Sequence, residues 1–299
     1  MKNLVVESKY DGKKLTRFLA HTMPNLSINN IYKTLRKRDI LINDNRISDN
    51  VILHTNDVVT LYITDELLYG KPVEIDVVYE DNNILVINKS IGIPVTDDKN
   101  NEISLSQLVK NKYHKSTFIP MPCHRIDRNT SGLVIFAKTF DILEFLLKKF
   151  ESREISKTYI CVVTGILDKK TDLLDAFLFK DSKKSLVYIS DTLIKGYLPI
   201  TTTYKVIKEN LEKNISLLEV NIETGRTHQI RAHLAHIGHH ILGDGKYGIN
   251  RTNKDFGVSE QLLCGYKLKF KFKECPTKFE YLNNMEFEIN YEHIKKYMD

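Results

Sequence analysis

The chain has 299 residues, of which 42% are hydrophobic and 27% charged, with a formal net charge of +6. This composition excludes a disordered or collagen-like chain and provides a core for about two ordinary domains. No apolar run approaches the roughly 18 residues that a membrane-spanning helix requires, so no membrane partner is expected.

The start of the chain and the cysteines indicate a compartment. The first ten residues, MKNLVVESKY, contain an apolar core of only three residues, which is too short for a secretory signal. The four cysteines, at positions 123, 161, 264 and 275, include no C-x-x-C pair and no short regular spacing. Neither a disulfide framework nor a zinc ribbon is therefore indicated, and a reduced cytoplasmic location is expected.

Positive charge is concentrated on the second of two helices predicted near the start. Three apolar residues at helical spacing mark the first helix: Leu15, Phe18 and Leu19. Ser27 is a good N-cap for the second helix, which is expected to run to residue 38. Its buried stripe is predicted to consist of Ile28, Ile31 and Leu35. Its other face carries four basic residues: Lys33, Arg36, Lys37 and Arg38.

The elements after the basic helix help to decide whether its charged face is a binding surface. Residues 40–47 predict a hairpin around an Asn-Asp-Asn turn, and residues 57–63 predict a strand. A single charge run on a helix is more often a solvated face than a binding surface. However, the order of elements over residues 12–63 resembles the alpha-L RNA-binding module, which occurs in a small-subunit ribosomal protein. The resemblance implies that residues 1–65 form an RNA-binding domain whose basic helix recognises charge and shape.

A break in the pattern at residues 65–72 predicts a linker to a second domain over residues 66–299. Thr139 can cap a helix that runs to residue 150. Predicted strands dominate the rest of this domain, at residues 75–79, 84–88, 133–138, 159–163, 204–208, 216–223 and 262–272. Because the strands are often neighbours in sequence, the expected fold is α+β, with a mostly antiparallel or mixed sheet and flanking helices.

The segment with the clearest chemical character is H-R-I-D-R-N-T-S-G-L, which runs from His124 to Leu133. It places Asp127 between Arg125 and Arg128, and a Thr-Ser-Gly turn follows that leads into an apolar strand. Such a turn can hold a carboxylate rigidly while the arginines compensate its charge or bind phosphates. From these residues alone, a charged surface loop remains an equally good interpretation.

This segment resembles the signature of the RluA-type pseudouridine synthases, H-R-[LI]-D-x-x-T-S-G-[LIVM], over ten positions. The resemblance implies an isomerase that converts uridine in RNA to pseudouridine, with Asp127 as the catalytic aspartate. Arg125 would displace the target nucleotide from its stack, and Ile126 would pack against the base. His124, beside them, is also expected to contact the RNA.

Two further segments resemble the same family. In Lys157-Thr158-Tyr159, a core tyrosine would be the ordinary interpretation, but the resemblance to the family's K-x-Y segment implies that Tyr159 stacks on the flipped uracil. The run T-G-R-T-H-Q-I-R, residues 224–231, is similar to a third family segment. It implies that Arg226 pairs with Asp127. The neighbouring residues that would contact RNA are His228, Gln229 and Arg231.

Two alternative sites are weighed in the same region. Five of the ten histidines lie between residues 228 and 240, and the spacing of His233, His236 and His239 would suit a metal on a helix. A metal site is not expected, because no cysteine or acidic residue is interspersed. Residues 243–248 satisfy G-x-G-x-x-G, but no strand precedes them and residues 249–255 are too polar for a helix start, so a dinucleotide site is not expected.

The predicted reaction breaks the N-glycosidic bond, turns the uracil and joins it again through C5. It involves no net redox change, phosphate transfer or hydrolysis, so no cofactor and no metal are expected. The expected partner is RNA, with large-subunit ribosomal RNA as the first choice and transfer RNA as the alternative. A monomer is the default expectation. The rival functions are a non-catalytic RNA-binding assembly factor and a metal-dependent hydrolase.

Overall fold

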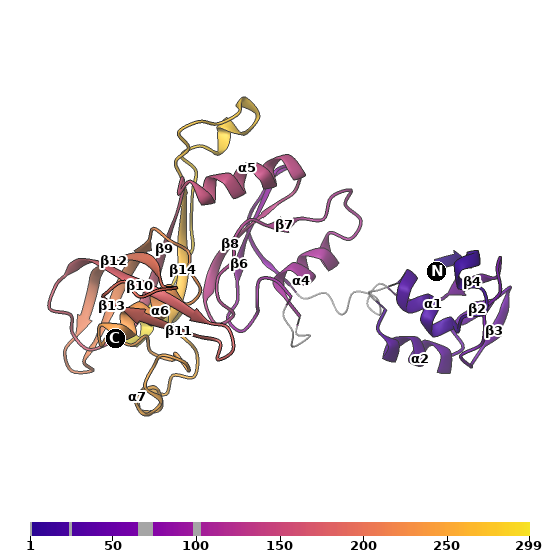
Figure 1. Ribbon diagram of the computed structural model, residues 1–299, viewed down its shortest axis with the longest axis horizontal. Coiled ribbons are helices and arrows are strands. Elements are labelled where there is room, and N and C mark those ends of the chain that lie inside the picture. The colour runs from indigo at the N-terminus through magenta and orange to yellow at the C-terminus, as the bar shows by residue number, and fades with distance from the viewer. Residues whose placement is uncertain (1, 24–25, 65–73, 98–102) are drawn as a thin grey trace. The chain divides into compact units, whose positions relative to one another are not determined.

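The computed structural model describes residues 2–23, 26–64, 74–97 and 103–299. The chain divides into two compact units, Met1–Glu74 (unit 1) and Ile75–Asp299 (unit 2). Figure 1 labels most of the elements of both units. The predicted linker at residues 65–72, and with it the predicted domain boundary, lies outside the described residues. None of the helices in the described part of the chain is long and apolar enough to cross a membrane.

Unit 1 combines two helices with a small antiparallel sheet. Within its described residues, four strands pair in the order β1-β4-β2-β3. The elements are β1 (Lys2–Val5), a 3-10 turn (Ser8–Tyr10), α1 (Leu15–Thr22), α2 (Ile28–Arg36), β2 (Ile40–Ile42), β3 (Asn45–Ile47) and β4 (Val58–Leu61). Both helices, the hairpin and the closing strand are confirmed. Strand β1 is not predicted by the sequence.

Helix α2 begins as predicted, since the Ser27 hydroxyl accepts a hydrogen bond from the Asn30 N–H at 3.2 Å. It ends two residues earlier than predicted, because Arg38 takes a φ of +56° just beyond the last turn. The prediction that Ile28 is buried is wrong, since this first helical residue is 57% exposed. Ile31 and Leu35 are buried as predicted, and Thr34 is buried on the same face beside them.

Unit 2 is built on one large, mostly antiparallel sheet. In its described part, eleven strands follow the order β11-β10-β12-β13-β9-β14-β8-β6-β5, with β15 beside β14 and β7 beside β8. The strands are β5 (Asp76–Glu80), β6 (Ile84–Lys89), β7 (Met121–Pro122), β8 (Ser131–Ala137), β9 (Ile155–Thr164), β10 (Thr171–Asp181), β11 (Leu186–Ser190), β12 (Leu198–Asn210), β13 (Ile215–Ile222), β14 (Leu263–Phe270) and β15 (Glu286–Glu288). Among the described strands of this sheet, only β8 and β14 pair in parallel. The predicted α+β fold with a mixed sheet is confirmed.

The helices of the described part of unit 2 are α4 (Leu105–Lys112), α5 (Phe140–Glu151), α6 (Gln229–His236), α7 (Asn250–Asp255) and α8 (Glu292–Lys295), with 3-10 turns at Thr277–Leu282 and Lys296–Met298. Thr139 caps α5 as predicted. The prediction that residues 249–255 form no helix is wrong, because α7 occupies them despite their polarity. Gly238, with a φ of +86°, ends α6 in a Schellman motif, in which the His239 N–H donates to the carbonyl of Leu234.

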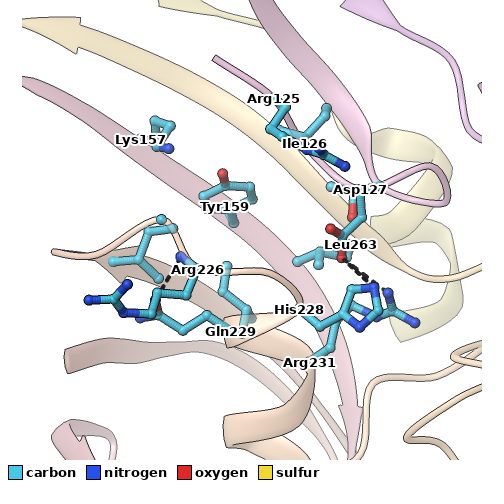
Figure 2. Close-up of a pocket in the computed structure, with 14 residues that line it drawn as sticks. Arg125, Ile126, Asp127, Lys157, Tyr159, Arg226, His228, Gln229, Arg231 and Leu263 are labelled. Carbon is cyan, nitrogen blue, oxygen red and sulfur yellow. Dashed lines mark hydrogen bonds and ion pairs between the residues drawn. The ribbon is translucent and has the colours of Figure 1, made fainter. Parts of the chain in front are cut away.

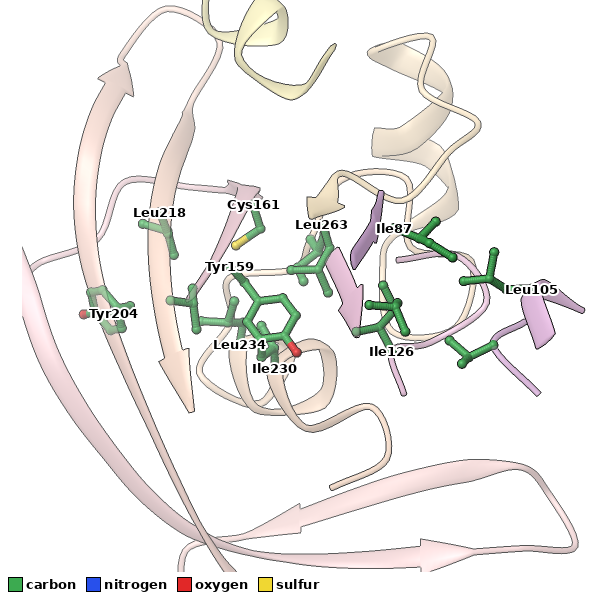
Figure 3. Close-up of a cluster of buried hydrophobic side chains, with 14 of the residues drawn as sticks. Ile87, Leu105, Ile126, Tyr159, Cys161, Tyr204, Leu218, Ile230, Leu234 and Leu263 are labelled. Atoms are coloured by element: carbon green, nitrogen blue, oxygen red, sulfur yellow. The ribbon is translucent and has the colours of Figure 1, made fainter. Parts of the chain in front are cut away.

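The sheet is covered on both faces near its centre. Residues of α4 and α6 pack on one face, in the core cluster of Figure 3, where Tyr159 lies among Ile126, Ile230 and Leu263. Residues of α5 pack on the other face. Alternate residues of β8 belong to the two clusters, Val134 to the first and Ile135 to the second. Burial on both faces explains why β8 is an unbroken apolar run.

Two glycines determine where β8 meets β14. Gly132 pairs with Gly265, and Gly132 has a φ of +118°, a conformation that other residues rarely adopt. A Cβ at Gly132 would lie 2.3 Å from the carbonyl oxygen of Gly265, and a Cβ at Gly265 would lie 3.2 Å from the Tyr159 ring. The glycine of the Thr-Ser-Gly turn is therefore required for the close approach of two strands directly beside Tyr159.

We expect Gly132→Ala to destabilise unit 2 by about 3 kcal/mol or more, since it adds a backbone clash to the strained φ. Gly196→Ala is the matched control. Gly196 also has a positive φ, +90°, but nothing lies within 4 Å of its Cβ position, so about 1 kcal/mol is expected. Urea unfolding measures both losses. Equal losses in the two variants would contradict the close approach as the cause.

Candidate active site

A pocket of about 410 Å³, including the solvent at its mouth, opens beside the central strands of unit 2. We call it the Asp127 pocket. The loop between β7 and β8, strand β9, the segment before α6 and the start of α6 all contribute to it, as Figure 2 shows. Fourteen of the described residues line it, among them Asp127, Tyr159, His228 and Arg231. Segments that are far apart in the sequence thus bring a carboxylate, an aromatic ring and several basic groups together.

The loop that carries Asp127 is held from two sides. The Asp127 carbonyl accepts the Thr130 N–H at 3.1 Å, which closes a turn, and the Thr130 hydroxyl accepts the amide of Gln261 at 3.0 Å. The ammonium of Lys89 donates to the carbonyl of Arg128 at 3.0 Å. Lys89 is buried, and burial lowers its pKa to about 7. These contacts position the carboxylate through its own backbone.

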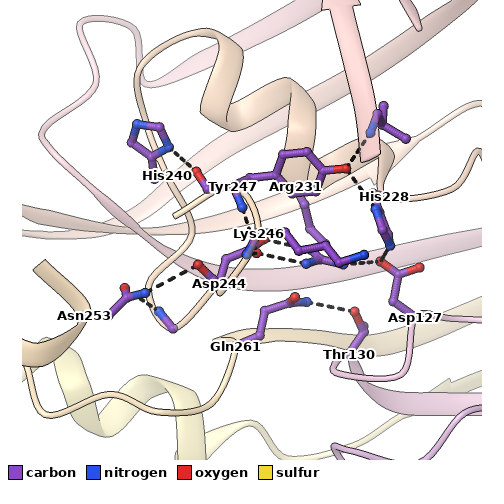
Figure 4. A network of polar contacts seen from close by, with 12 residues as sticks. Asp127, Thr130, His228, Arg231, His240, Asp244, Lys246, Tyr247, Asn253 and Gln261 are labelled. Atoms are coloured by element: carbon purple, nitrogen blue, oxygen red, sulfur yellow. Dashed lines mark hydrogen bonds and ion pairs between the residues drawn. The ribbon is translucent and has the colours of Figure 1, made fainter. Parts of the chain in front are cut away.

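Arg231 joins two carboxylates. Its Nη1 donates to Asp127 Oδ2 at 3.0 Å, while its Nε and Nη2 donate to the two oxygens of Asp244 at 2.8 Å each (Figure 4). The Asp244 side chain is 0% exposed, whereas that of Asp127 is 21% exposed toward the pocket. Burial acts to raise the pKa of Asp244, but the hydrogen bonds from Arg231 and from the amides of residues 246 and 247 outweigh it and hold the pKa below its usual value.

His228 faces Asp127 from the other side. Its Nε2 lies 3.9 Å from Asp127 Oδ2, and its Nδ1 lies 2.9 Å from the hydroxyl of Tyr247. That hydroxyl accepts the Val187 N–H at 2.8 Å, so its own proton is available for Nδ1. Burial lowers the pKa of His228 to about 4. We therefore assign a neutral ring with its proton on Nε2, directed toward the carboxylate.

Tyr159 forms an aromatic wall of the pocket. Its side chain, from β9, is only 5% exposed, and Figure 2 shows it between Arg226 and Asp127. Burial, together with the negative charge of Asp127, raises the pKa of its hydroxyl well above the usual 10. The phenol is therefore protonated at neutral pH, and its ring offers an apolar face while its hydroxyl remains a hydrogen-bond donor.

The family of the chain is shown by comparison with known proteins. The sequence family described as RNA pseudouridylate synthase matches residues 83–236, which include Asp127, Tyr159 and Arg231. The chain belongs to this family. It is an RNA pseudouridine synthase, an isomerase that acts on uridine in RNA. The activity that the ten-residue segment around Asp127 predicts is thereby confirmed.

Individual relatives extend beyond the matched region. A Mycoplasma capricolum subsp. capricolum protein named uncharacterized RNA pseudouridine synthase is 30% identical over 300 residues, covering 95% of this chain and 96% of the relative. The ribosomal large subunit pseudouridine synthase C of Vibrio cholerae is 26% identical over 291 residues, covering 92% and 90%. The solved structure of human RNA pseudouridylate synthase domain containing 4 superimposes with a TM-score of 0.61 at 19% identity, covering 80% and 98%, and so shares the fold.

The predicted ion pair between Arg226 and Asp127 is wrong, because Arg231 occupies that place in this pseudouridine synthase. Arg226 precedes α6, and Figure 2 shows its guanidinium across the pocket from Asp127. Its Nε is buried without a hydrogen-bond partner among the described residues. Arg231 lies inside α6, whose first turn faces the Asp127 loop. His228 lies between the two arginines as the N-cap of α6, and its left-handed backbone, with a φ of +54°, directs the chain into the helix.

The other predicted residues of the first family segment lie at or near the pocket. Ile126 is buried in its wall, and exposed Arg125 lines it. His124 is turned away from Asp127. Its Nε2 accepts the Ile135 N–H at 3.2 Å, and its ring packs on Phe150 with centroids 4.6 Å apart. Of these three residues, the Asp127 pocket thus contains Arg125 and Ile126.

Gln229 lines the pocket but is engaged by the protein. Its amide oxygen accepts the Thr224 hydroxyl at 2.7 Å and the Arg226 N–H at 3.3 Å. Its amide nitrogen donates to Thr201 O at 3.0 Å and to the Thr202 hydroxyl at 3.2 Å. With four protein partners and 2% exposure, this side chain fixes the loop that precedes α6.

The three histidines weighed as metal ligands have separate partners. His233 Nδ1 lies 3.0 Å from the Thr202 hydroxyl, His236 Nε2 lies 2.8 Å from Asp191, and His239 Nδ1 lies 2.9 Å from the carbonyl of Thr164. Each imidazole ring contacts a different residue of the fold, so these contacts explain the three histidines without a shared ligand.

The four basic residues predicted for the second helix are exposed: Lys33, Arg36, Lys37 and Arg38. Lys33 and Arg36 lie in the last turn of α2, and Lys37 and Arg38 follow it directly. The positive ends of these side chains and the carbonyl end of the helix lie together, which is the favourable arrangement for a helix dipole. They belong to unit 1, whereas the Asp127 pocket belongs to unit 2.

Sequence reasoning misses three residues that hold the site together. Asp244 and Tyr247 lie in the G-x-G-x-x-G stretch, whose glycine spacing attracts attention to a dinucleotide site instead. Lys89 is the last residue of the apolar strand β6, where a lysine by itself does not indicate a role in a site. The one available signal is the L-G-D sequence at residues 242–244, in which an isolated acidic residue follows an apolar pair and a glycine.

We expect Asp244→Asn to destabilise the protein by about 3–5 kcal/mol, since it breaks a buried ion pair. Isomerisation should also fall at least tenfold, because Arg231 is no longer held against Asp127. Unfolding in urea and turnover on an RNA transcript measure the two effects. Asp255→Asn, an exposed aspartate on α7, is the control. Full turnover in a folded Asp244→Asn variant would show that Asp244 does not orient Arg231.

Proposed function

We propose that this pseudouridine synthase isomerises uridines of large-subunit ribosomal RNA in the Asp127 pocket, with Asp127 as the catalytic carboxylate. The observation that supports the assignment is the position of Asp127. It is the partly exposed partner of the buried Arg231, beside the ring of Tyr159. A carboxylate fixed in this way is oriented before the substrate arrives, which is what electrostatic catalysis requires.

The reaction needs a carboxylate close to the sugar. The N1–C1′ bond of uridine breaks and a C5–C1′ bond forms, while the proton of C5 leaves and N1 gains one. The negative charge of Asp127 would stabilise the positive charge that develops at C1′ of the ribose as the glycosidic bond breaks. Arg231 compensates that charge in the resting site, and the Nε2–H of His228 is a further donor beside it.

The remaining groups would bind the nucleotide. A uridine inside a helix must leave its stack to reach Asp127, and base stacking on an aromatic side chain is worth about 1–3 kcal/mol. Tyr159 would provide that surface, with Ile126 as the apolar group next to it. Since the Tyr159 hydroxyl is protonated at neutral pH, we assign Tyr159 to stacking and donation rather than to proton removal. Arg125, exposed at the mouth, would occupy the gap in the RNA stack.

The choice of ribosomal RNA over transfer RNA is supported by a relative. The Vibrio cholerae protein is named for the ribosomal large subunit, and it is similar over 92% of this chain. Unit 2 has only 225 of the 299 residues, so this similarity extends into unit 1. The free cysteines, three of them buried, agree with the reducing cytoplasm as the site of action.

We expect Asp127→Asn to reduce isomerisation at least about a thousandfold while RNA affinity changes only a few-fold. Asparagine keeps the size of the side chain and removes its charge. The release of tritium from C5-labelled uridine in a large-subunit ribosomal RNA transcript measures turnover, and filter binding measures affinity. Asp255→Asn should release tritium at the parental rate. If both Asp127→Asn and Asp127→Ala still turn over, the assignment of Asp127 is refuted.

We further propose that unit 1 is the alpha-L RNA-binding domain. Exchanging Lys33, Arg36 and Lys37 for glutamine in the full chain should raise KM and leave kcat nearly unchanged. The slope of log Kd against log salt should fall by about 2, given about 0.7–0.9 per phosphate contact. Lys13→Gln with Lys14→Gln is the control, because these lysines are also exposed in unit 1. An unchanged slope would place RNA binding elsewhere.

A further inference from the structure

Lys157 is a cation at the pocket that none of the roles above uses. It lies on β9, two residues before Tyr159, so the two side chains project from the same face of the strand, about 6.6 Å apart along it. Lys157 lines the Asp127 pocket and also a neighbouring hollow whose lining includes Arg125, Phe150 and Asn221. We call this second space the side hollow. The ammonium of Lys157 therefore stands where the two spaces meet.

This ammonium has no anionic partner among the described residues. In that part of the chain, no carboxylate lies within 4.0 Å of Lys157 Nζ and no hydrogen-bond acceptor faces it; its contact is the Phe150 ring, 5.7 Å away at the centroid. Among the described residues of unit 2, the other buried or half-buried lysines have partners: Lys89 two carbonyls, Lys138 Glu80 at 2.7 Å, Lys149 Glu154 at 2.7 Å and Lys267 Glu288 at 2.8 Å. Burial lowers the pKa of Lys157. A bound anion would stabilise the charged form of the ammonium, which burial disfavours.

Space for such an anion is present. A Cβ added at Gly225 would lie 3.2 Å from Lys157 Nζ, so the absence of a side chain there leaves the ammonium accessible. Gly225 lines both the Asp127 pocket and the side hollow. Of the two acidic residues that line the side hollow, Glu223 is paired with Arg153 at 3.3 Å and Glu151 is exposed to solvent. The adjacent Arg226, which lines the Asp127 pocket, adds a second cation without a carboxylate partner among the described residues.

We propose that Lys157 binds a backbone phosphate of the RNA substrate, next to the uridine held in the Asp127 pocket. The proposal rests on the proposed function and adds a phosphate subsite to it. A phosphate suits this position better than the uracil itself, because the carbonyl groups of uracil are neutral and would leave a partly buried positive charge uncompensated. A charge-assisted hydrogen bond to phosphate compensates it. The distance along β9 fits a contact within about one nucleotide of the base on Tyr159.

The test measures RNA binding by the full chain carrying Asp127→Asn, which prevents turnover, with and without Lys157→Met. The probe is a large-subunit ribosomal RNA transcript between 50 and 300 mM KCl. Methionine keeps the length of the side chain and removes the charge. We expect Kd to rise roughly tenfold at 100 mM salt and the slope of log Kd against log salt to fall by about 0.7–0.9. Lys157→Arg should keep the slope.

Two controls make the result decisive. Lys254→Met, an exposed lysine of α7, should leave Kd and slope unchanged. With Asp127 intact, Lys157→Met should raise KM and change kcat only a few-fold, measured by tritium release.

An unchanged slope of log Kd against log salt in Lys157→Met would refute the phosphate site, and a loss of kcat alone would indicate contact with the uracil. If Lys157→Met lowers the melting temperature, Lys157→Gln takes its place under the same criterion. Absence of tritium release from the parent chain would instead refute the proposed function.

Discussion

The guanidinium of Arg231 is the interaction on which the geometry of the site depends. Three of its nitrogens are directed at two carboxylates, two at Asp244 and one at Asp127. The planar fork of arginine allows this division, whereas lysine could offer only a point charge. Because Asp244 is fully buried and paired bidentately, the guanidinium is held by the protein before it meets Asp127. The Asp127 carboxylate is therefore placed against a group that is already oriented.

The backbone around Asp127 is held just as closely. The turn from Asp127 to Thr130 leads directly into β8, whose first residues pair with β14 through two glycines. The same close approach brings Gly265 against the ring of Tyr159. The carboxylate and the aromatic surface are thus positioned by one junction of strands, so a change at Gly132 would alter both. This explains physically why the ten-residue segment continues past Asp127 into an apolar strand.

The sequence predicts the elements whose signals are local and misses those that depend on distant pairing. The cap at Ser27, the cap at Thr139 and the apolar run of β8 are all recognisable within a few residues. Strands β10 and β11 are not predicted, because their exposed faces carry apolar residues such as Leu173 and Tyr188, which blurs the alternation. The sequence pattern also does not determine whether Arg226 or Arg231 pairs with Asp127. That pairing is decided by the left-handed conformation of His228 and by where α6 begins.

The G-x-G-x-x-G spacing of residues 243–248 has a cause that does not involve a nucleotide. A Cβ at Gly243 would lie 1.9 Å from the carbonyl oxygen of Glu260, and one at Gly248 would lie 2.3 Å from that of Asp244. The turn must therefore pack closely on its neighbours and on itself. In doing so it directs Asp244 to Arg231 and places Tyr247 with its ring 5.3 Å from the guanidinium and its hydroxyl on His228. That hydroxyl also accepts the N–H of Val187 in β11, the edge strand of the sheet. The turn therefore connects this edge, through Tyr247 and His228, to the Asp127 carboxylate.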